Sequence, residues 1–224
     1  RILFAAGASG SGKTLITCGI LQAFHDRGMK VASFKCGPDY IDPMFHTKVI
    51  GTKSRNLDTF FTDGDTTRYL LERNSRGCDL AVMEGVMGYY DGVGGTTVKA
   101  SAYDLARTTG TPAVLIVNCK GMSVSILPYI KGFLEFQPDS QIKGVLLNQM
   151  SSMIEEQLQV KVYGYVPKVE DCVIESRHLG LVMPQEVQGF QEKLKKLAAV
   201  LEKTVDLDGL LSLGETAPPL TISE

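Results

Sequence analysis

Residues 7–14 read Gly-Ala-Ser-Gly-Ser-Gly-Lys-Thr, and they constrain the fold more than any other stretch of the chain. They follow an apolar run, Ile2–Ala6, and lead into a helical pattern, Lys13–Arg27. A strand, a loop with the spacing Gly-x4-Gly-Lys-Thr and a helix, in that order, are the setting of a phosphate-binding loop. Its glycines let backbone N–H groups curl around phosphates, and the helix N-terminus adds its dipole. The sequence therefore predicts a nucleoside triphosphate site.

Two residues of this loop have chemical tasks that the motif predicts. We expect Lys13 to reach the β- and γ-phosphates and the Thr14 hydroxyl to bind Mg²⁺. GTPases, transport ATPases, kinases and ligases all share the motif, so it selects no function by itself. Two features narrow the choice. The guanine signature Asn-Lys-x-Asp is absent, since the corresponding strand end reads Asn148-Gln-Met, and Ala8 stands where partition ATPases carry an additional lysine.

The remainder of the chain alternates short apolar runs with helical patterns. The runs hardly alternate in polarity, which is typical of parallel strands covered on both faces. The expected strands are Ile2–Ala6, Val31–Phe34, Leu80–Met83, Ala113–Val117, Gly144–Leu147 and Val162–Val166. The expected helices are Lys13–Arg27, Asp65–Asn74, Lys99–Thr109, Val124–Glu135, Ser152–Gln159 and Gln185–Lys203. This order predicts an α/β fold with a three-layer, doubly wound and mostly parallel sheet.

The tail differs in character from the rest of the chain. Residues 1–205 suffice for one α/β domain with a sizeable core. Beyond them, Asp206–Ser212 has the pattern of one further turn, and Gly214–Pro219 has the composition of a linker. The sequence therefore predicts a linker over 206–224 that leads to another domain.

Composition excludes several classes of partner. The net charge is −2, so no electrostatic footprint for nucleic acid or an anionic membrane is present. No stretch approaches the 18 or so apolar residues of a membrane span. The five cysteines are dispersed without a C-x-x-C pair, a usage typical of reduced thiols in the cytoplasm.

A charged segment follows the second apolar run. It reads Lys35-Cys-Gly-Pro-Asp39-Tyr-Ile-Asp42-Pro, at the carboxyl end of a strand, where open α/β sheets bind their ligands. Lys35 has the charge to neutralise phosphoryl oxygens, and Asp39 and Asp42 have the carboxylates to bind metal or orient a nucleophile. The alternative is a solvated turn in which the two aspartates cap a helix.

Two further acidic residues are candidate metal ligands. Asp58 ends the stretch Ser54–Asp58, which we expect to be a loop, and it has an alternative as a turn residue. Glu84 ends a buried strand and is followed by glycine, a pattern like the second acidic motif of triphosphate-binding proteins. Mg²⁺ prefers carboxylate and phosphate oxygens, so Glu84 is the better candidate.

With these segments together, the chain resembles the synthetase domain of the cobyrinic acid a,c-diamide synthase family, whose ATP domain is similar to dethiobiotin synthetase. The string Gly-Pro-Asp-Tyr-Ile-Asp-Pro is the most specific part of the resemblance, and the phosphate loop is the least specific. The matching stretches are residues 8–14, 34–43, 54–58, 84–92, 144–148 and 176–181, which cover nearly the whole chain in order.

The resemblance implies a role for each matching position. The residues implied to bind ATP are Ser9, Gly10, Ser11, Gly12, Lys13, Thr14 and Leu15, with Asn148 at the adenine. The implied metal ligands are Thr14, Asp58 and Glu84, and the segment that handles the substrate carboxylate is Asp39, Tyr40, Ile41 and Asp42. The expected catalytic residues are Lys13, Lys35, Asp42 and Glu84. Arg177 and His178 lie in a further matching motif without an assigned role, and for His178 a packed or helix-capping position is favoured.

The resemblance also implies an activity. It is the ATP-dependent amidation of the a and c acetate side chains of a corrin or related tetrapyrrole, through an acyl phosphate, in cobalamin biosynthesis. Ammonia would come from glutamine through a C-terminal glutaminase domain, and related ATP domains pair as homodimers. Three alternatives stay open: a ligase acting on nickel-sirohydrochlorin, a ligase of the dethiobiotin synthetase kind, and a ParA-like ATPase switch that binds a partner.

Overall fold

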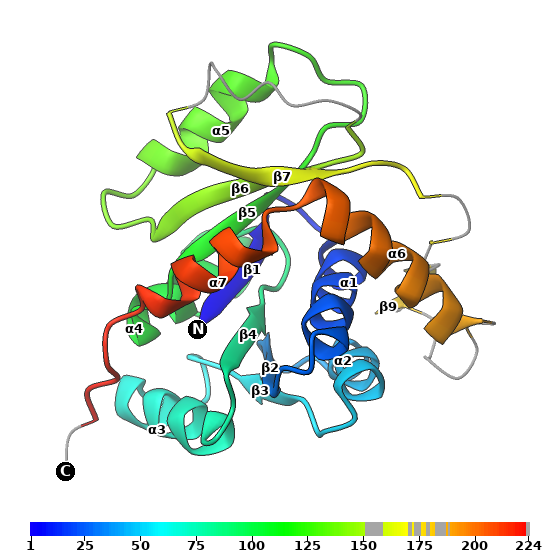
Figure 1. Ribbon diagram of the computed structural model, residues 1–224. Coiled ribbons are helices and arrows are strands. Elements are labelled where there is room, and N and C mark those ends of the chain that lie inside the picture. Colours follow the sequence, from blue (N-terminus) through cyan, green and yellow to red (C-terminus); the bar gives the residue numbers. More distant parts are fainter. Residues whose placement is uncertain are drawn as a thin grey trace.

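The computed structural model describes residues 1–150, 159–169, 172, 176–177, 180–181, 187 and 189–222. Within these ranges the chain forms one seven-stranded sheet of order β3-β2-β4-β1-β5-β6-β7, in which every pairing is parallel (Figure 1). The strands are β1 Ile2–Ala6, β2 Val31–Cys36, β3 Arg55–Leu57, β4 Leu80–Glu84, β5 Ala113–Asn118, β6 Ile142–Asn148 and β7 Lys161–Val166. A separate antiparallel pair joins β8 Ser176–Arg177 to β9 Gly180–Leu181.

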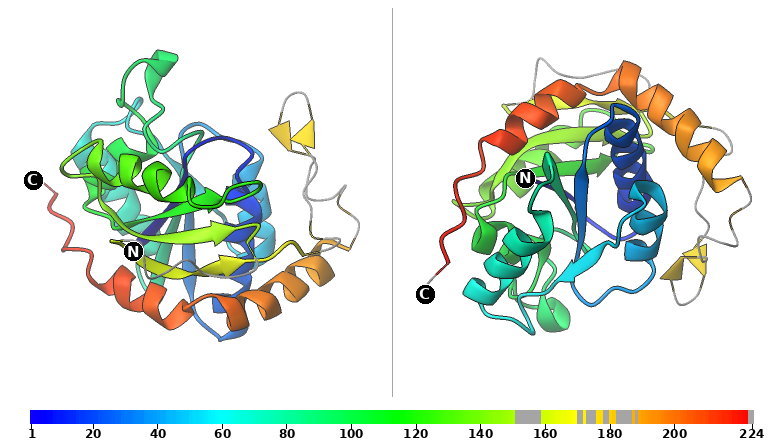
Figure 2. Two further views of the ribbon diagram at one scale, coloured as in Figure 1. Left: turned by 90° about the horizontal axis from the view of Figure 1, so that it is seen from above. Right: turned by 60° about the horizontal axis from the view of Figure 1, so that its bottom comes forward.

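Helices cover both faces of this sheet, as Figure 2 shows. One apolar core lies between the sheet and α1, α2, α6 and α7, and a second lies between the opposite face and α3, α4 and α5. The helices are α1 Lys13–Asp26, α2 Asp42–Ile50, α3 Gly64–Ser75, α4 Ala102–Thr109, α5 Ile126–Glu135, α6 Phe190–Thr204 and α7 Leu207–Glu215, with a 3-10 turn η1 at Val93–Gly95. The expected three-layer α/β fold is confirmed.

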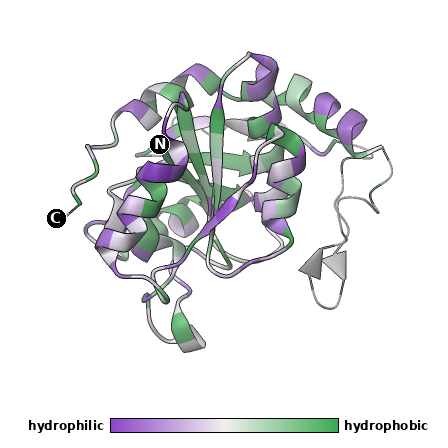
Figure 3. Ribbon diagram, turned by 90° about the horizontal axis from the view of Figure 1, so that it is seen from below, coloured by the Kyte–Doolittle hydropathy of each residue, from purple (hydrophilic) through white to green (hydrophobic). Residues whose placement is uncertain are grey.

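The apolar runs became strands because both of their faces are covered. All five residues of β1 and all five of β4 are buried, so neither face can tolerate the polar alternation of a half-exposed strand. Figure 3 shows these apolar strands at the centre of the molecule. All six strands expected from the sequence are present, with ends that agree to within two residues.

Two short elements differ from the expectation. The stretch expected as a loop contains β3, which pairs with β2 from Phe34↔Arg55 to Cys36↔Leu57. Only Leu57 of its three residues is buried, so its sequence lacks the apolar run that marks an inner strand. Helix α2 was likewise not expected, because its first turn lies within the charged Asp-Pro segment; Pro43 suits that position, since a first-turn residue needs no intrahelical N–H partner.

The tail is more ordered than the expected linker. Helix α7 spans Leu207–Glu215, and three of its four leucines, 207, 210 and 213, are buried in the same core as α1 and α6. The amino group of Arg1 donates to the Gly214 carbonyl at 2.7 Å, and its guanidinium donates to the Pro218 carbonyl at 2.6 Å. Residues 206–218 therefore pack against the domain. The predicted start of a linker at residue 206 lies too early in the sequence, because α7 occupies Leu207–Glu215. The existence of a further domain stays a prediction.

Some expectations fall on residues that the structure does not describe. These are most of the expected helix Ser152–Gln159 and His178, while Arg177 is described only as part of β8. Within the part of the chain that is described, no helix has the length and apolarity to cross a membrane. Cys18, Cys36, Cys78 and Cys119 carry free thiols.

Candidate active site

The carboxyl ends of the parallel strands surround a cavity of about 880 Å³. Parallel α/β sheets bind their ligands at this edge, because the connecting loops there diverge around a crevice. The phosphate loop, the loop after β2, the loop after β4 and the loops after β6 and β7 all contribute. Among the residues with predicted roles, those lining the cavity are Ser9, Gly10, Gly12, Lys13, Thr14, Leu15, Lys35, Asp39, Tyr40, Ile41, Asp42 and Asn148.

The phosphate loop has the backbone that its glycines permit. Gly10 and Gly12 have φ of 73° and 90°, in the left-handed region that other residues adopt only with strain. A Cβ atom on Gly12 would lie 2.6 Å from Asn148 Nδ2, so this glycine is also required by close packing. The Lys13 ammonium donates to the carbonyls of Ala8 at 3.1 Å and Met87 at 2.7 Å. Burial, together with the nearby charge of Lys35, lowers the pKa of Lys13 to about 8.

Glu84 is the centre of the site. It is fully buried at the end of β4, and its Oε1 accepts from Thr14 Oγ1 and from Lys35 Nζ, each at 2.8 Å. Its Oε2 lies 2.6 Å from His46 Nε2. Burial alone would raise the pKa of Glu84, but the charge of Lys35 and the hydrogen bond with His46 hold it well below its ordinary value. Glu84 is therefore an ionised carboxylate within hydrogen-bond reach of the phosphate loop.

Lys35 joins this carboxylate to the second acidic residue. Its Nζ lies 2.6 Å from Asp42 Oδ2, and the Lys35 side chain is 2 % exposed. Burial opposes its charged form, but the carboxylates of Glu84 and Asp42 outweigh burial and raise the pKa of Lys35. Burial and the negative charge of Glu84 raise the pKa of Asp42 in spite of the ion pair with Lys35. The pair places one cation between two carboxylates next to the phosphate loop.

The segment from Asp39 to Asp42 forms one edge of the cavity. Asp39 Oδ1 accepts from the backbone N–H groups of Ile41 at 2.9 Å and Asp42 at 3.1 Å, so Asp39 does act as the turn-stabilising residue of the plain alternative. Asp42 instead turns toward Lys35. Tyr40 is 86 % exposed on the cavity rim, an unusual position for a large aromatic side chain. The segment thus combines a structural aspartate with groups that face the cavity.

Asn148 makes a contact that its sequence position does not reveal. Its Nδ2 donates to the Ser11 carbonyl at 2.9 Å, although 137 residues separate the two. The side chain therefore braces the phosphate loop as well as lining the cavity. The adenine contact expected for Asn148 stays a prediction.

Asp58 does not join the site. Its Oδ1 accepts from the Phe60 N–H at 2.8 Å, as expected for a turn residue, while its buried Oδ2 has no hydrogen-bond partner among the described residues. It follows β3, the edge strand, and β2 separates that strand from β4, at whose end Glu84 lies. No cluster of three or more acidic, histidine or cysteine side chains suitable for a metal is found in the described ranges. The geometry therefore supports Glu84 and Thr14 as candidate ligands, and the metal role of Asp58 stays a prediction.

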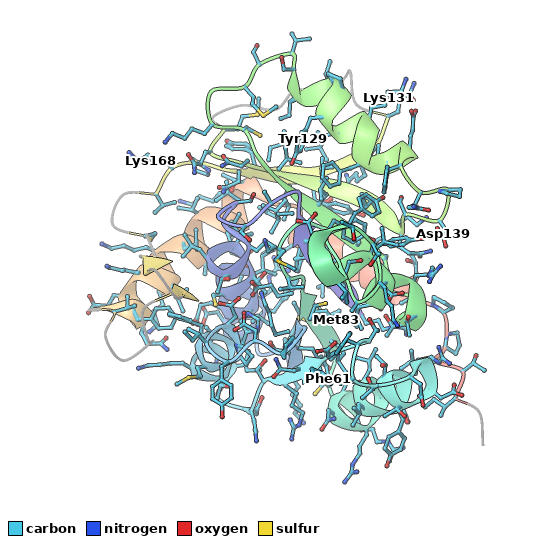
Figure 4. All side chains as sticks on the ribbon, turned by 180° about the vertical axis from the view of Figure 1, so that it is seen from behind. Phe61, Met83, Tyr129, Lys131, Asp139 and Lys168 are labelled. Atoms are coloured by element: carbon cyan, nitrogen blue, oxygen red, sulfur yellow. The ribbon has the colours of Figure 1, made fainter. Side chains whose placement is uncertain are left out.

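Several residues of the site were not expected from the sequence. His46 is fully buried against Glu84, and Asp42 precedes it by four residues on α2, which places both on one helix face. The four-residue spacing between Asp42 and His46 is the feature of the sequence from which His46 could have been predicted to face the site. Tyr129 of α5 packs on the phosphate loop, since a Cβ atom on Gly7 would overlap its hydroxyl, and Figure 4 shows Tyr129 between α5 and the sheet. Lys120, Gln149 and Lys168 also line the cavity, and no motif pointed to them.

The arrangement can hold a triphosphate and its magnesium ion. The phosphate loop supplies backbone N–H groups at a helix N-terminus and one ammonium group. The Thr14 hydroxyl and the Glu84 carboxylate are hard oxygen donors of the kind Mg²⁺ prefers, and they lie in contact beside that loop. Lys35 shares Glu84 Oε1 with Thr14, and Lys35 and its partner Asp42 line the same cavity as Thr14. The fold and site define a P-loop nucleotide-binding protein.

Comparisons with known proteins place it more closely. Residues 2–182 match the family described as CobQ/CobB/MinD/ParA nucleotide binding domain. The chain is 39% identical over 232 residues to cobyrinate a,c-diamide synthase of Listeria monocytogenes, covering 99% of this chain and 51% of that protein. It is 40% identical over 220 residues to that of Clostridium acetobutylicum, covering 94% and 50%. The chain spans about half the length of the curated relatives it matches.

Solved structures agree on the fold. The MinD cell division protein of Aquifex aeolicus covers 100% of this chain at a TM-score of 0.51 and 13% identity, and the chain covers 99% of it. The signal recognition particle receptor FtsY of Elizabethkingia anophelis has a TM-score of 0.54 at 11% identity, with 88% of this chain and 65% of the other covered. The chain belongs to the CobQ/CobB/MinD/ParA nucleotide-binding family, and the resemblance to cobyrinic acid a,c-diamide synthases is confirmed.

Proposed function

We propose that this chain is the ATP-dependent, carboxylate-activating part of a cobyrinate a,c-diamide synthase. The observation that carries the proposal is the Thr14–Glu84–Lys35–Asp42 cluster, which joins the phosphate loop to the Gly-Pro-Asp-Tyr-Ile-Asp segment. Thr14, Lys35 and Asp42 line the cavity, and the fully buried Glu84 links Thr14 to Lys35. Generic nucleotide binding needs only the loop. A cation shared between two carboxylates in the same cavity as the phosphate loop is suited to bringing a substrate carboxylate to a bound triphosphate.

The reaction divides into two steps. A carboxylate is inert toward ammonia at neutral pH, because its oxygen is a poor leaving group. In the first step a substrate carboxylate oxygen attacks the γ-phosphorus and the bond to the β-phosphate breaks. ADP is the leaving group, and the substrate becomes an acyl phosphate. In the second step ammonia attacks the acyl carbon, inorganic phosphate leaves, and the nitrogen loses a proton to give the amide.

The protein contributes mainly position and charge to these steps. Lys13 would exchange its contacts with the Ala8 and Met87 carbonyls for the β- and γ-phosphates. Lys35 would offset the negative charge of the transferring group, while Asp42 holds Lys35 in place and handles the substrate carboxylate. A magnesium ion held by Thr14 and Glu84 would supply further positive charge at the phosphates.

The substrate and partners follow from the named relatives. The two proteins are called cobyrinate a,c-diamide synthases, so the substrate proposed here is a corrin with acetate side chains. The exposed Tyr40 ring lies where such a macrocycle would approach the cavity. Ammonia would come from glutamine through a glutaminase domain, and the chain would pair as a homodimer. The cytoplasm is the expected compartment.

The alternatives make different demands on the site. Nickel-sirohydrochlorin also carries acetate side chains, so the same cluster would serve it. A partition-type ATPase switch is less favoured, because Ala8 lacks the additional lysine and such a switch needs no substrate segment like residues 37–43. The likeness to MinD concerns the fold alone.

A direct assay separates these possibilities. The protein, with ATP, Mg²⁺ and ammonium chloride, is incubated in turn with cobyrinic acid, with nickel-sirohydrochlorin and without a tetrapyrrole, and the products are separated by chromatography and mass spectrometry. The proposal expects a diamide, with ADP and phosphate released in equal amounts to the amide formed. ATP binding without amide formation from either tetrapyrrole would refute it, and hydrolysis independent of tetrapyrrole would favour the switch.

A further inference from the structure

His46 is a buried histidine to which neither the motifs nor the proposed reaction gives a task. It lies on the first turns of α2, is fully buried, and contacts Glu84 through one ring nitrogen and Ser33 through the other. The distances are 2.6 Å from Nε2 to Glu84 Oε2 and 2.7 Å from Nδ1 to Ser33 Oγ. Both ring nitrogens are therefore engaged, which fixes the plane of the ring.

The acceptor chemistry of Glu84 determines which ring nitrogen carries the proton. An ionised carboxylate only accepts hydrogen bonds, so Nε2 of His46 must be the donor to it. In the neutral ring Nδ1 then accepts from the Ser33 hydroxyl. The Ser33 hydroxyl in turn lies 3.1 Å from the Ser54 hydroxyl, which also lies 3.1 Å from the Ser33 carbonyl. Each of these side chains is buried, so the chain of contacts is isolated from water.

The two oxygens of Glu84 have separate partners. Oε2 contacts His46, whereas Oε1 contacts Thr14 and Lys35. The last torsion of a glutamate side chain is soft and roughly two-fold, so the backbone does not fix the orientation of the carboxylate. Without a donor on Oε2, the carboxylate is free to turn about this torsion and lose the geometry in which Oε1 meets both Thr14 and Lys35. A fixed donor on Oε2 therefore keeps Oε1 on the side of the phosphate loop.

We propose that His46 is a positioning residue, which holds Glu84 Oε2 so that Oε1 is presented beside Thr14 for a magnesium nucleotide. The role rests on the proposed nucleotide site and not on the identity of the tetrapyrrole. Carboxylates that bind metal ions are usually oriented by such an outer hydrogen bond, and loss of that bond typically lowers metal affinity or activity 10- to 100-fold. His46 would not touch nucleotide or substrate.

A pair of isosteric variants separates positioning from packing. In His46→Gln the side-chain amide nitrogen can occupy the place of Nε2 and keep the contact with Glu84. In His46→Asn the amide can occupy the place of Nδ1, so the contact with Ser33 survives and the contact with Glu84 is lost. Both are polar, and neither is larger than histidine. The matched control is His25→Gln, on an exposed turn of α1.

The measurement is the Kd of ATP by calorimetry, with and without Mg²⁺, together with the melting temperature of each variant. We expect His46→Asn to weaken Mg²⁺-dependent ATP binding by about 10- to 100-fold, with little change in the binding of metal-free ATP. We expect His46→Gln and the control to bind like the original protein. Equal affinity of the Asn and Gln variants for magnesium ATP, or an equal loss with and without Mg²⁺, would overturn the proposal.

A second experiment covers poor folding of the asparagine variant. Ser33→Ala removes the partner of Nδ1 with little change in volume, and it is expected to weaken magnesium ATP binding in the same direction but by less. In a His46→Gln background the same serine change should have no further effect, since the ring through which it acts is gone. Additive effects would overturn the proposal. No tetrapyrrole is used, so failure of the amidation assay leaves these outcomes unaffected.

Discussion

Replacing Lys35 by methionine tests the charge arrangement of the site most directly. Methionine fills a similar volume without charge, so the change leaves Glu84 and Asp42 as two buried carboxylates without their shared cation. Lys35 is 2 % exposed and Glu84 is fully buried, so water cannot replace the missing ammonium group. Removing one partner of a buried ion pair costs about 3–5 kcal/mol. For a domain of this size, that lowers the melting temperature by roughly 6–20 °C at neutral pH.

The deficit should depend on pH in a defined direction. In the original protein the pKa of Glu84 is depressed, so its stabilising contribution is present above the unfolded pKa and is lost as pH falls toward the folded one. In Lys35→Met both carboxylates are buried near each other, and their pKa values rise above the unfolded values. The variant therefore gains stability as the pH falls and the carboxylates take up protons. The difference between the two proteins is largest near pH 7 and shrinks toward pH 4.

Urea unfolding at several pH values, followed by circular dichroism, measures this difference. The matched control is Lys30→Met, an exposed lysine next to the start of the same strand, which should change stability by no more than about 0.5 kcal/mol. Adding Glu84→Gln to Lys35→Met should restore part of the lost stability, because the two groups are in contact. A Lys35→Met protein as stable as the original at pH 7, or a deficit that stays constant with pH, would refute the reasoning.

Three further changes test other parts of the structure. Asp42→Asn should leave ATP affinity within about threefold and reduce amidation strongly, because Asp42 pairs with Lys35 and belongs to the segment proposed to handle the substrate carboxylate. An equal loss of ATP binding would make it a nucleotide residue. The affinity of the protein for ATP should weaken above about pH 8, at most tenfold per pH unit, because Lys13 has a pKa of about 8 and binds phosphate as the cation. Calorimetry in buffers of different ionisation enthalpy should detect proton uptake on binding. An ATP affinity that does not change with pH would contradict this prediction. Leu210→Ala should lower the free energy of unfolding in urea by about 2–5 kcal/mol, because this side chain of α7 is fully buried, whereas the same change in an exposed linker would cost almost nothing.

The short elements show why part of the fold was not predictable. β3 has one buried residue, so periodicity carries no signal for it, and it exists because its backbone groups pair with the edge of β2. Three α7 leucines, 207, 210 and 213, have a helical spacing. The glycine and the prolines of residues 214–219 nevertheless favour a linker when the sequence is considered alone. The helix forms because those leucines are buried in the same apolar core as side chains of α1 and α6. Local patterns do not contain the surface against which a segment will pack.

The site divides in the same way. The sequence by itself determined the phosphate loop, the strands that lead to each acidic segment and the edge of the sheet where these segments end, because those features depend on spacing within about twenty residues. Tertiary structure alone decided which of them meet. It joins Thr14 to Glu84 across 70 residues, Lys35 to Glu84 across 49 and His46 to Glu84 across 38, and it leaves Asp58 outside. The physical reason is the strand order: β4 lies between β1 and β2, so the ends of these strands converge on Glu84, whereas β3 lies at the edge of the sheet.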